Sequence, residues 1–523
     1  MPTAPSSAEG VARQHDAVRA AADLRHLVAF RAAAVRGRAR PAVGVGLGVV
    51  VTLTVLAASL PAHLPGAAGT PGPGLLRSDQ VLDLLPVAYL GVLVVSLVSA
   101  AVSGGGRELL ARDLAVAFPI SPTTDHLGSL MMAPLNIAWL LQGWTVLAAT
   151  AFAVGPQHLV AVQLPVLLWL GAATALAQVV AWAMEWLRRG RRGPWVVRSL
   201  GAVAVLTATG VVVSGEARVL LERSPTSFVL EAVLDGSTGS WLPWAGRSAL
   251  LLGVAALGVV VGAFLAHALA RRPVREESRL ETAVHAPRTH PGSDLVALMR
   301  VDRAGVWRSV PVRRGFTVLA VLPGLVALAG GLTWSTVILL PGLVVSGAAL
   351  LFGVNVWALD GRGALWRESV PVSPGLVLTA RVVVMGEVLL TTAGLVLVLA
   401  AVRAGVPSPA EAAAVASVTV VVTLQVLSGS VRWSVRRPFA VDLRSARATP
   451  APPLTMVGYS TRLAVVTTLT GMVFVAVSQA PSWTWPVVVA VPFVVTSLLR
   501  MRRTARAWRD PAVRSLVVTT VAG

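Results

Sequence analysis

Two residue types are missing from this 523-residue chain, which contains no cysteine and no lysine. Without cysteine, the chain cannot form disulfides, zinc–thiolate sites, iron–sulfur clusters or a cysteine nucleophile. Without lysine, it cannot contain a phosphate-binding loop of the form GxxxxGK[ST], and it cannot form a Schiff base at lysine. If ATP drives this protein, another chain must therefore hydrolyse it.

Charged residues are also scarce. They make up 13% of the chain, whereas hydrophobic residues make up 55% and the mean hydropathy is +0.74. A soluble domain has roughly 25% charged residues. The apolar residues occur in runs about twenty residues long, which match the hydrocarbon thickness of a bilayer. Because each run must satisfy its own backbone hydrogen bonds in lipid, the sequence predicts an all-α integral membrane protein.

The apolar runs predict about 12 transmembrane helices. In the first half we expect spans at residues 42–61, 81–103, 129–153, 160–184, 195–214 and 247–270. In the second half we expect spans at residues 316–333, 336–357, 380–402, 411–430, 462–480 and 483–500. No cleavable signal peptide is expected in residues 1–40, which are polar and contain arginine.

The distribution of arginine predicts the orientation. A net charge of +20 could indicate nucleic-acid binding, but the arginines form short clusters at the ends of the apolar runs. With both termini inside, 36 arginines fall in cytoplasmic segments and 4 in external ones, and 4 lie at span edges. This bias is typical of membrane topology. Since arginine-only usage suggests a GC-rich bacterial genome, we expect a multi-pass protein of the bacterial cytoplasmic membrane with no nucleic-acid partner.

The order of the predicted elements suggests two six-helix repeats. Each half opens with a basic amphipathic stretch, at Leu24–Arg38 and at Leu295–Arg308. Two spans, a short cytoplasmic loop and four more spans follow. The predicted domains are an N-terminal amphipathic segment (1–40), a first six-span domain (41–270), a cytoplasmic linker with an amphipathic helix (271–315), a second six-span domain (316–500) and a cytoplasmic tail (501–523).

The second amphipathic stretch is expected to lie at the membrane surface. Its predicted apolar side consists of Leu295, Leu298, Met299, Val301, Val306 and Trp307. The residues expected to face lipid headgroups are Arg300, Arg303 and Arg308. A surface helix with no partner and a helix that supports docking are both compatible with this pattern.

The two cytoplasmic loops share a short motif. Residues 119–122 read PISP and residues 371–374 read PVSP, each after a segment that contains glycine and arginine. Proline fixes φ and lacks an N–H, so each pair of prolines should end one helix and start the next, with Ser121 or Ser373 as the N-cap. A single copy suggests an ordinary turn, whereas two copies at matching positions favour a shared role.

These features resemble the membrane subunits of ABC-2 type exporters, especially permeases in which two six-span units are fused. The resemblance covers the layout of nearly the whole chain, and its sequence signal is strongest at residues 360–363 (DGRG) and 371–374. It implies that the loop between spans two and three contains a coupling helix that docks on a separate ATPase subunit. The family's external re-entrant segment would correspond to residues 215–246, and the second half lacks such a segment.

The resemblance thus implies a membrane-spanning permease that forms the translocation path for an unknown substrate. Its expected partners are ATP-binding-cassette ATPase subunits and membrane lipid, and ATP hydrolysis is expected on the separate subunit. The predicted coupling-loop residues are Arg107, Arg112, Pro119, Ser121, Pro122, Asp360, Arg362, Arg367, Pro371, Ser373 and Pro374.

One acidic residue, Glu387, lies deep inside a predicted span. An intramembrane carboxylate is costly and suggests a functional site, such as a proton relay or a substrate contact. The simpler interpretation is a Glu that is hydrogen-bonded or neutral and packs against Thr391 or a neighbouring helix. A proton- or ion-coupled secondary transporter is therefore the main alternative function, and a membrane-embedded enzyme is a weaker one.

The histidines do not indicate a metal centre. They are scattered through the chain and form neither an HExxH motif nor another paired set with carboxylates. We accordingly expect no catalytic residues, no metal and no cofactor in this chain.

Overall fold

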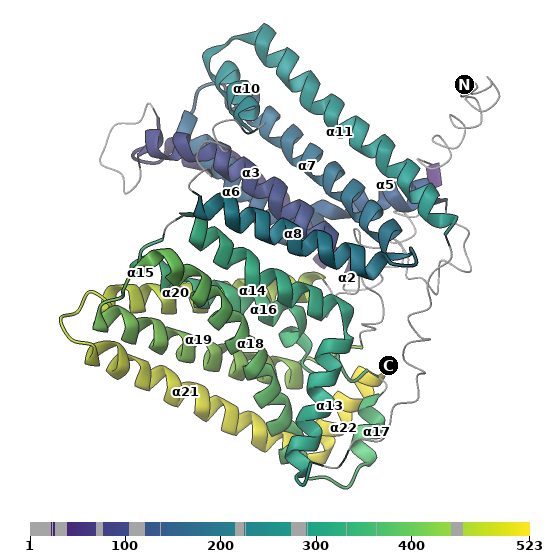
Figure 1. Cartoon of the computed structure of the whole chain (residues 1–523), viewed down its shortest axis with the longest axis vertical. Helices are drawn as coiled ribbons and strands as arrows, with labels where there is room; N and C mark the ends of the chain where they lie inside the picture. The colour runs from purple at the N-terminus through teal and green to yellow at the C-terminus, as the bar shows by residue number, and fades with distance from the viewer. Residues whose placement is uncertain are drawn as a thin grey trace. The chain divides into compact units, whose positions relative to one another are not determined.

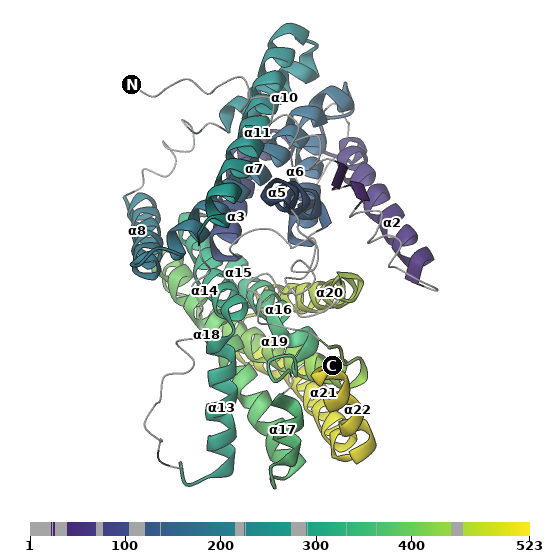
Figure 2. The same ribbon diagram turned by 90° about the vertical axis from the view of Figure 1, so that its right-hand side faces the viewer.

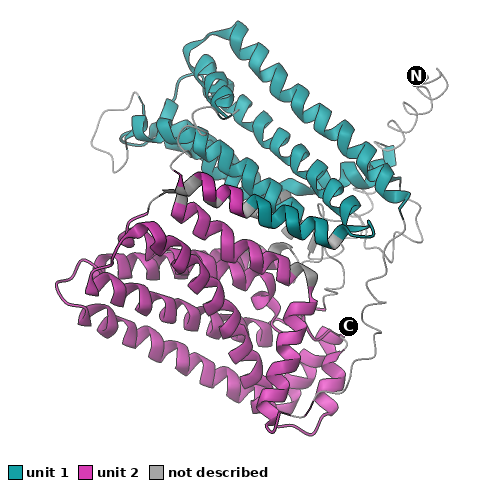
Figure 3. Ribbon diagram, in the orientation of Figure 1, with its two compact units in different colours: residues 1–204, 215–276 teal, residues 205–214, 277–523 magenta. Residues whose placement is uncertain are grey.

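The computed structural model describes residues 22–23, 25–26, 39–68, 77–103, 121–135, 137–214, 224, 226–272, 289, 291–330, 332–361, 363–440 and 453–523. All regular secondary structure in these residues is helical. The chain divides into two compact units (Figure 3), each described separately below. The first contains residues 1–204 and 215–276, and the second contains residues 205–214 and 277–523.

The first unit contains the helices of the N-terminal half (Figure 1). They are α2 (Ala39–Ser59), η1 (Leu60–His63), α3 (Ser78–Ser103), α5 (Pro122–Met132), η2 (Ala133–Leu135), α6 (Ile137–Val154), α7 (Leu159–Arg188), α8 (Gly193–Val213, of which residues 205–213 belong to the second unit), α10 (Ser227–Thr238) and α11 (Trp241–Ala270).

Helix α7 organises the first unit, because it packs along α3, α6, α10 and α11. Its buried face combines bulky side chains such as Trp169 with several alanines, and small side chains let neighbouring helices approach closely. The Gln163 side chain donates hydrogen bonds to the carbonyls of Ala58 (2.9 Å) and Leu147 (3.0 Å). The Trp169 indole donates to the carbonyl of Tyr89 at 3.1 Å. These bonds join α7 to α2, α6 and α3 inside an apolar core.

The second unit contains the helices of the C-terminal half (Figures 1 and 2). They are α13 (Asp294–Arg308), α14 (Val310–Gly330), α15 (Trp334–Val337), α16 (Leu340–Phe352), η3 (Gly353–Asn355), α17 (Gly363–Ser369), α18 (Pro374–Ala404), α19 (Pro409–Arg436), α20 (Pro453–Val477), α21 (Thr484–Arg509) and α22 (Pro511–Ala522).

The core of the second unit lies where α16, α18 and α19 meet, with α20 and α21 packed against α19. It is built largely from small and β-branched side chains, among them Val345, Ala348, Val384, Val421 and Val422. Such side chains keep helices close together, which suits helix packing in lipid.

Each of the twelve predicted spans overlaps at least one helix of the structure. Among the described residues, eight helices are long and apolar enough to cross a membrane, or nine if α13 and α14, bent by 81° at their junction, count as one span. Helices α2, α6 and α8 contribute shorter apolar segments. The chain is therefore an all-α multi-pass membrane protein, and the count of twelve spans and the two repeats stay predictions.

One predicted span is interrupted in the structure. The prediction of a continuous helix over residues 129–153 was wrong, since α5 ends at Met132, η2 follows and α6 begins at Ile137. Pro134 lies at this break, where it cannot supply an N–H to a helix. The segment predicted as a cytoplasmic tail is largely helical. It contains the end of α21, which continues to Arg509, and α22, which packs against α17.

Candidate functional site

The candidate site is the segment that joins η3 to α18 in the second unit. The chain leaves η3 through a series of turns, and Gly361 adopts a left-handed conformation at φ 49°. The amide of Gly363 donates to the Asp360 carbonyl at 2.8 Å, which starts α17. After α17, Ser373 caps α18, and its hydroxyl accepts from the Leu376 amide at 3.4 Å. The predicted N-cap at Ser373, with Pro374 in the first turn, is confirmed.

Two aspartates and two arginines form a buried ion network beneath α17. We call Asp302, Asp360, Arg367 and Arg381 the charge cluster. Asp302 comes from α13, Asp360 from the turn before α17, Arg367 from α17 and Arg381 from α18. The side chains of Asp302 and Arg381 are only 2% and 3% exposed. The cluster therefore ties four separate elements together at one buried point.

The distances in the charge cluster show that both arginines bridge both aspartates. Arg381 Nη2 lies 3.0 Å from Asp302 Oδ1 and 2.7 Å from Asp360 Oδ1. Arg367 Nη2 lies 2.5 Å from Asp302 Oδ1 and 3.1 Å from Asp360 Oδ1. Arg381 Nη1 also donates to the carbonyl of Val356 at 2.7 Å. The charges balance, which is the condition under which buried ions are tolerated.

Aromatic side chains link the charge cluster to α21. The Arg381 guanidinium lies 5.3 Å from the ring centroid of Trp357. Trp357 stacks on Trp508 of α21 with a centroid distance of 4.2 Å and an interplanar angle of 6°. The Trp508 indole donates to the carbonyl of Pro374 at 3.1 Å. The start of α18 is thus fixed to the end of α21.

Helix α17 is held on a second side by α22 (Figures 1 and 2). Arg514 of α22 forms an ion pair with Glu368 of α17, with Nε and Oε1 2.5 Å apart. Asp510 caps α22 by accepting from the Ala512 amide at 3.0 Å. In contrast, Leu365 and Trp366 on α17 are 53% and 67% exposed. Helix α17 is therefore anchored through polar side chains and presents apolar ones outward.

The first loop is described only at its end. Arg107, Arg112 and Pro119 lie outside the described residues, as does Arg362 of the second loop. The Ser121 hydroxyl accepts from the Thr124 amide at 3.1 Å and caps α5, with Pro122 as the first helical residue. This N-cap is also as predicted. Both serine–proline pairs therefore start helices in the same local way.

A buried histidine, His126, joins α5 to α7 and α11. The Trp182 indole donates to His126 Nδ1 at 3.0 Å. Because tryptophan is only a donor, Nδ1 must accept, and the ring hydrogen lies on Nε2. Nε2 donates to the Val259 carbonyl at 3.0 Å. Burial lowers the pKa of His126 below its ordinary value, which favours this neutral form.

Glu387 lies on α18 and is paired with an arginine from the amphipathic helix. Arg303 of α13 donates to both carboxylate oxygens, at 2.8 Å from Nε and 2.5 Å from Nη2. Thr391 donates to the Glu387 backbone carbonyl at 2.6 Å and not to its carboxylate. Arg303 was expected to face headgroups, and instead it joins α13 to α18 through a bidentate ion pair.

The buried face of α13 also differs from the prediction. Asp302 and Val306 are buried, whereas Val301 and Trp307, which were predicted on the apolar side, are about half exposed. Residues three to four positions apart share a helix face, so Asp302, Val306 and Met299 lie on one side. That face carries a charge because Asp302 forms ion pairs within the charge cluster. The residues that the sequence did not reveal as part of this site are Asp302, Arg381, Trp357, Trp508 and Arg514.

Comparison with known protein families, with curated proteins and with solved structures gives no match for this chain. Any functional conclusion must therefore come from the residues and geometry of the chain itself.

Proposed function

We propose that the chain is the membrane-spanning permease of an ATP-binding-cassette exporter, with ATP hydrolysis on separate cytoplasmic subunits. In this proposal α17 is the coupling helix of the second half. The observation that carries it is the anchoring of α17, through Arg367 to the charge cluster and through Glu368 to α22, while Leu365 and Trp366 face outward. Exposed aromatic and aliphatic side chains on a rigid support are typical of docking surfaces.

The anchoring of α17 is suited to transmitting force. A push on α17 acts on Arg367, and the charge cluster passes it to α13 and α18 through ion pairs of 2.5–3.1 Å. The stacked pair of Trp357 and Trp508 extends the connection to α21. Because these groups are buried and rigidly packed, movement of α17 relative to α18 alone would leave charges unpaired. Rigid-body movement of the helices is the less costly response.

The proposal includes a repeat of six helices in each half, and helix contacts within the two units support it. In the first unit α7 packs along α11, and in the second unit α19 packs along α21. Likewise α3 packs on α6 and α7, and α16 packs on α18 and α19. The serine–proline cap precedes α5 in one unit and α18 in the other. The proposed permease lies in a bacterial cytoplasmic membrane with both termini and both coupling loops in the cytoplasm.

The pairing of Glu387 with Arg303 favours the exporter over a proton-driven transporter. A proton-relay carboxylate must exchange its proton during transport, and a bidentate arginine stabilises the charged form. We therefore assign Glu387 the role of joining α13 to α18.

Affinity purification of the tagged full chain from its native membranes tests the proposal. We expect an ATP-binding-cassette ATPase to copurify with the wild-type chain, and its ATP hydrolysis to depend on the chain's presence. L365A/W366A should reduce recovery of the ATPase at least severalfold, whereas W483A, which removes an exposed tryptophan between α20 and α21, should not. Purification that never recovers an ATPase, together with transport driven by a proton gradient, would overturn the proposal.

A further inference from the structure

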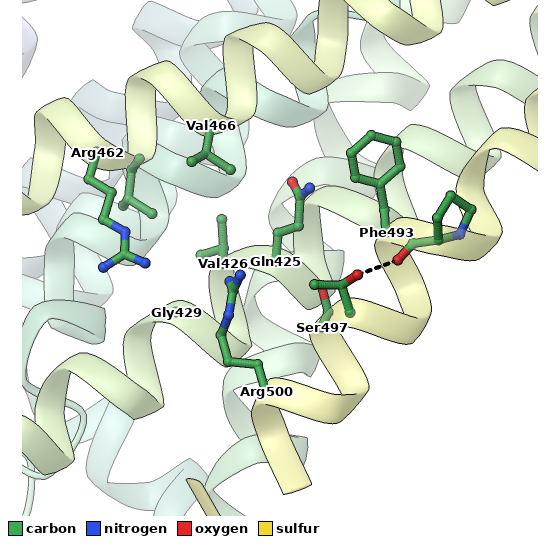
Figure 4. Close-up of a pocket in the computed structure, with 11 residues that line it drawn as sticks. Gln425, Val426, Gly429, Arg462, Val466, Phe493, Ser497 and Arg500 are labelled. Atoms are coloured by element: carbon green, nitrogen blue, oxygen red, sulfur yellow. Dashed lines mark hydrogen bonds between the residues drawn. The ribbon is translucent and has the colours of Figure 1, made fainter. Parts of the chain in front are cut away.

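A cavity of about 340 Å³ lies within the second unit, between α19, α20 and α21 (Figure 4). It is distinct from the charge cluster and is not used by the proposed coupling. Its walls come from the second half of α19, the first half of α20 and the middle of α21. In the predicted topology the end of the cavity lined by Arg462 and Arg500 lies toward the cytoplasm.

Two arginines line one end of this cavity, and a third lies near them on α19. Arg462 of α20 and Arg500 of α21 line the cavity, and both side chains extend into the space between the helices (Figure 4). Arg432 follows Gly429 by one turn on α19 and acts electrostatically on Arg500, as does Arg462. No described residue forms an ion pair or a hydrogen bond with any of these three guanidinium groups.

Three neighbouring cations without an acid are electrostatically unfavourable. In the charge cluster of the same unit, one aspartate neutralises the charge of each arginine. At the cavity no described acid provides this balance. An anion from outside the chain would supply this balance.

Beyond the arginines the cavity wall is largely apolar. Ser497 contributes a hydroxyl group one turn from Arg500, and Val466 and Phe493 contribute apolar wall. The Gln425 amide lies beside these apolar side chains, where its oxygen accepts from the Thr470 hydroxyl at 3.1 Å (Figure 4). Phe493 precedes Arg500 by two turns of α21, or about 10 Å along the helix axis. A ligand that fills the cavity must have an anionic end and an apolar end.

We propose that this cavity binds an anionic phospholipid, with the phosphate between Arg462 and Arg500 and an acyl chain along Val466 and Phe493. Guanidinium groups pair with phosphate oxygens in bidentate geometry, and hydroxyl groups add further donors. Basic pockets between transmembrane helices at the cytoplasmic side suit anionic headgroups, which are enriched in that leaflet. A free phosphate ion would satisfy the arginines but would leave the apolar wall without a partner. The proposal does not depend on the exporter function.

Lipid binding to the purified full chain in a neutral detergent tests this site. The probes are phosphatidylglycerol, phosphatidylcholine with the same acyl chains, and inorganic phosphate. The readouts are lipid-bound species in native mass spectrometry and the shift in Tm as each probe is titrated. The test variant is R462Q/R500Q. The matched control is R502Q/R503Q, which removes two exposed arginines from α21 outside the cavity.

For the wild-type chain and the control we expect phosphatidylglycerol to bind and to raise the Tm. In R462Q/R500Q its apparent affinity should fall about thirtyfold, since each of the two arginines contributes about a fivefold factor. The lipid-free Tm of R462Q/R500Q should not fall, because the substitutions relieve repulsion between like charges. Phosphatidylcholine and inorganic phosphate should each produce a smaller Tm shift.

Three outcomes would overturn the proposal. The first is equal loss of phosphatidylglycerol binding in the two double variants, which would show a general effect of charge. The second is equal stabilisation by inorganic phosphate, which would make the site one for a free anion. The third is equal binding of phosphatidylcholine, which would leave the three arginines without a role.

Discussion

At the scale of single residues, the charge cluster is the feature on which the candidate site depends most. Arg381 contacts both aspartates and the carbonyl of Val356, so no other side chain in the cluster has as many partners. Removing one member of a buried pair leaves an uncompensated charge, which costs more than the pair itself contributes. Removing a single charge from the cluster should therefore destabilise the chain more than removing one aspartate and one arginine together.

We expect Arg381→Gln to lower the free energy of unfolding by about 3–5 kcal/mol, because two aspartates would then face one arginine. The measurement is thermal unfolding of the purified chain in detergent, followed by tryptophan fluorescence. The control is Arg308→Gln on α13, since Arg308 is exposed and has no ion pair with a described residue. R381Q should be less stable than this control.

The double variant D302N/R381Q makes the test sharper. It restores charge balance, with Asp360 and Arg367 still paired, and should recover part of the stability that R381Q loses. D302N alone should be measured as well. If the double variant is less stable than R381Q by the full loss of stability seen in D302N, the two residues act independently.

His126 predicts a dependence of stability on pH. Its pKa is lowered in the folded chain, so the unfolded chain binds more protons between the folded pKa and the ordinary value of about 6.5. The contribution of His126 is complete above that ordinary value and declines as the pH falls toward the folded pKa. We expect the Tm of the wild-type chain to fall between pH 7.5 and pH 5.5 by more than that of H126Q.

His267→Gln is the matched control for this pH dependence. Among the described residues, the His267 ring forms a hydrogen bond only within its own helix, to the Ala263 carbonyl at 3.0 Å. The H267Q chain should therefore keep the pH dependence of the wild-type chain. An H126Q chain that loses as much Tm as the wild-type chain between the two pH values would show that other groups cause the loss.

At the scale of elements, the contact of α5 with α11 depends on one glycine. A Cβ on Gly262 would lie 2.3 Å from His126 Cε1 and 2.6 Å from Nε2. His126 would have to move and lose its hydrogen bonds to Trp182 and to Val259. We expect G262A to lower the free energy of unfolding by about 1–3 kcal/mol, measured by thermal unfolding in detergent.

Gly253 on the same helix provides the control for G262A. A Cβ there would meet nothing within 4 Å, and alanine has the higher helix propensity. G253A should therefore be at least as stable as the wild-type chain. If G262A matched G253A, the close packing of α5 on α11 would not contribute to stability.

The helices could be predicted from the sequence because each one is encoded locally. Long apolar runs predict helices in lipid, and Ser373 before Pro374 predicts the start of α18. The same local reasoning failed at residues 133–135, where Pro134 interrupts a run that is largely apolar. It also missed α22, because a 12-residue apolar segment after Asp510 and Pro511 is too short to span a membrane.

The charge cluster could not be predicted in this way. Asp302 and Arg381 lie 79 positions apart, and neither periodicity nor motif spacing shows which helices bring them together. The sequence did contain one signal, an arginine near the start of an apolar run, which requires partners if it is buried. Arg381 lies at the start of the predicted span over residues 380–402, and its partners come from α13 and from the turn before α17.

At the scale of the whole molecule, the proposed function requires both coupling loops on one side of the membrane. Helix α18 has 31 residues and is therefore about 45 Å long, which exceeds the hydrocarbon thickness of about 30 Å. Leu365 precedes this helix and Val406 follows it, so the two residues should lie on opposite sides. Thr123, in the first turn after the other serine–proline cap, should lie on the side of Leu365.

Because the chain contains no cysteine, single cysteines can test this arrangement without background labelling. We expect V406C, at a position 95% exposed, to react with a membrane-impermeant maleimide in intact cells. T123C and L365C should react only after the membrane is permeabilised. Labelling of T123C and L365C from opposite sides would contradict the two-fold repeat and the exporter proposal together. The assignment as a multi-pass membrane protein would stand, because it depends on the length and apolarity of the helices and not on their direction.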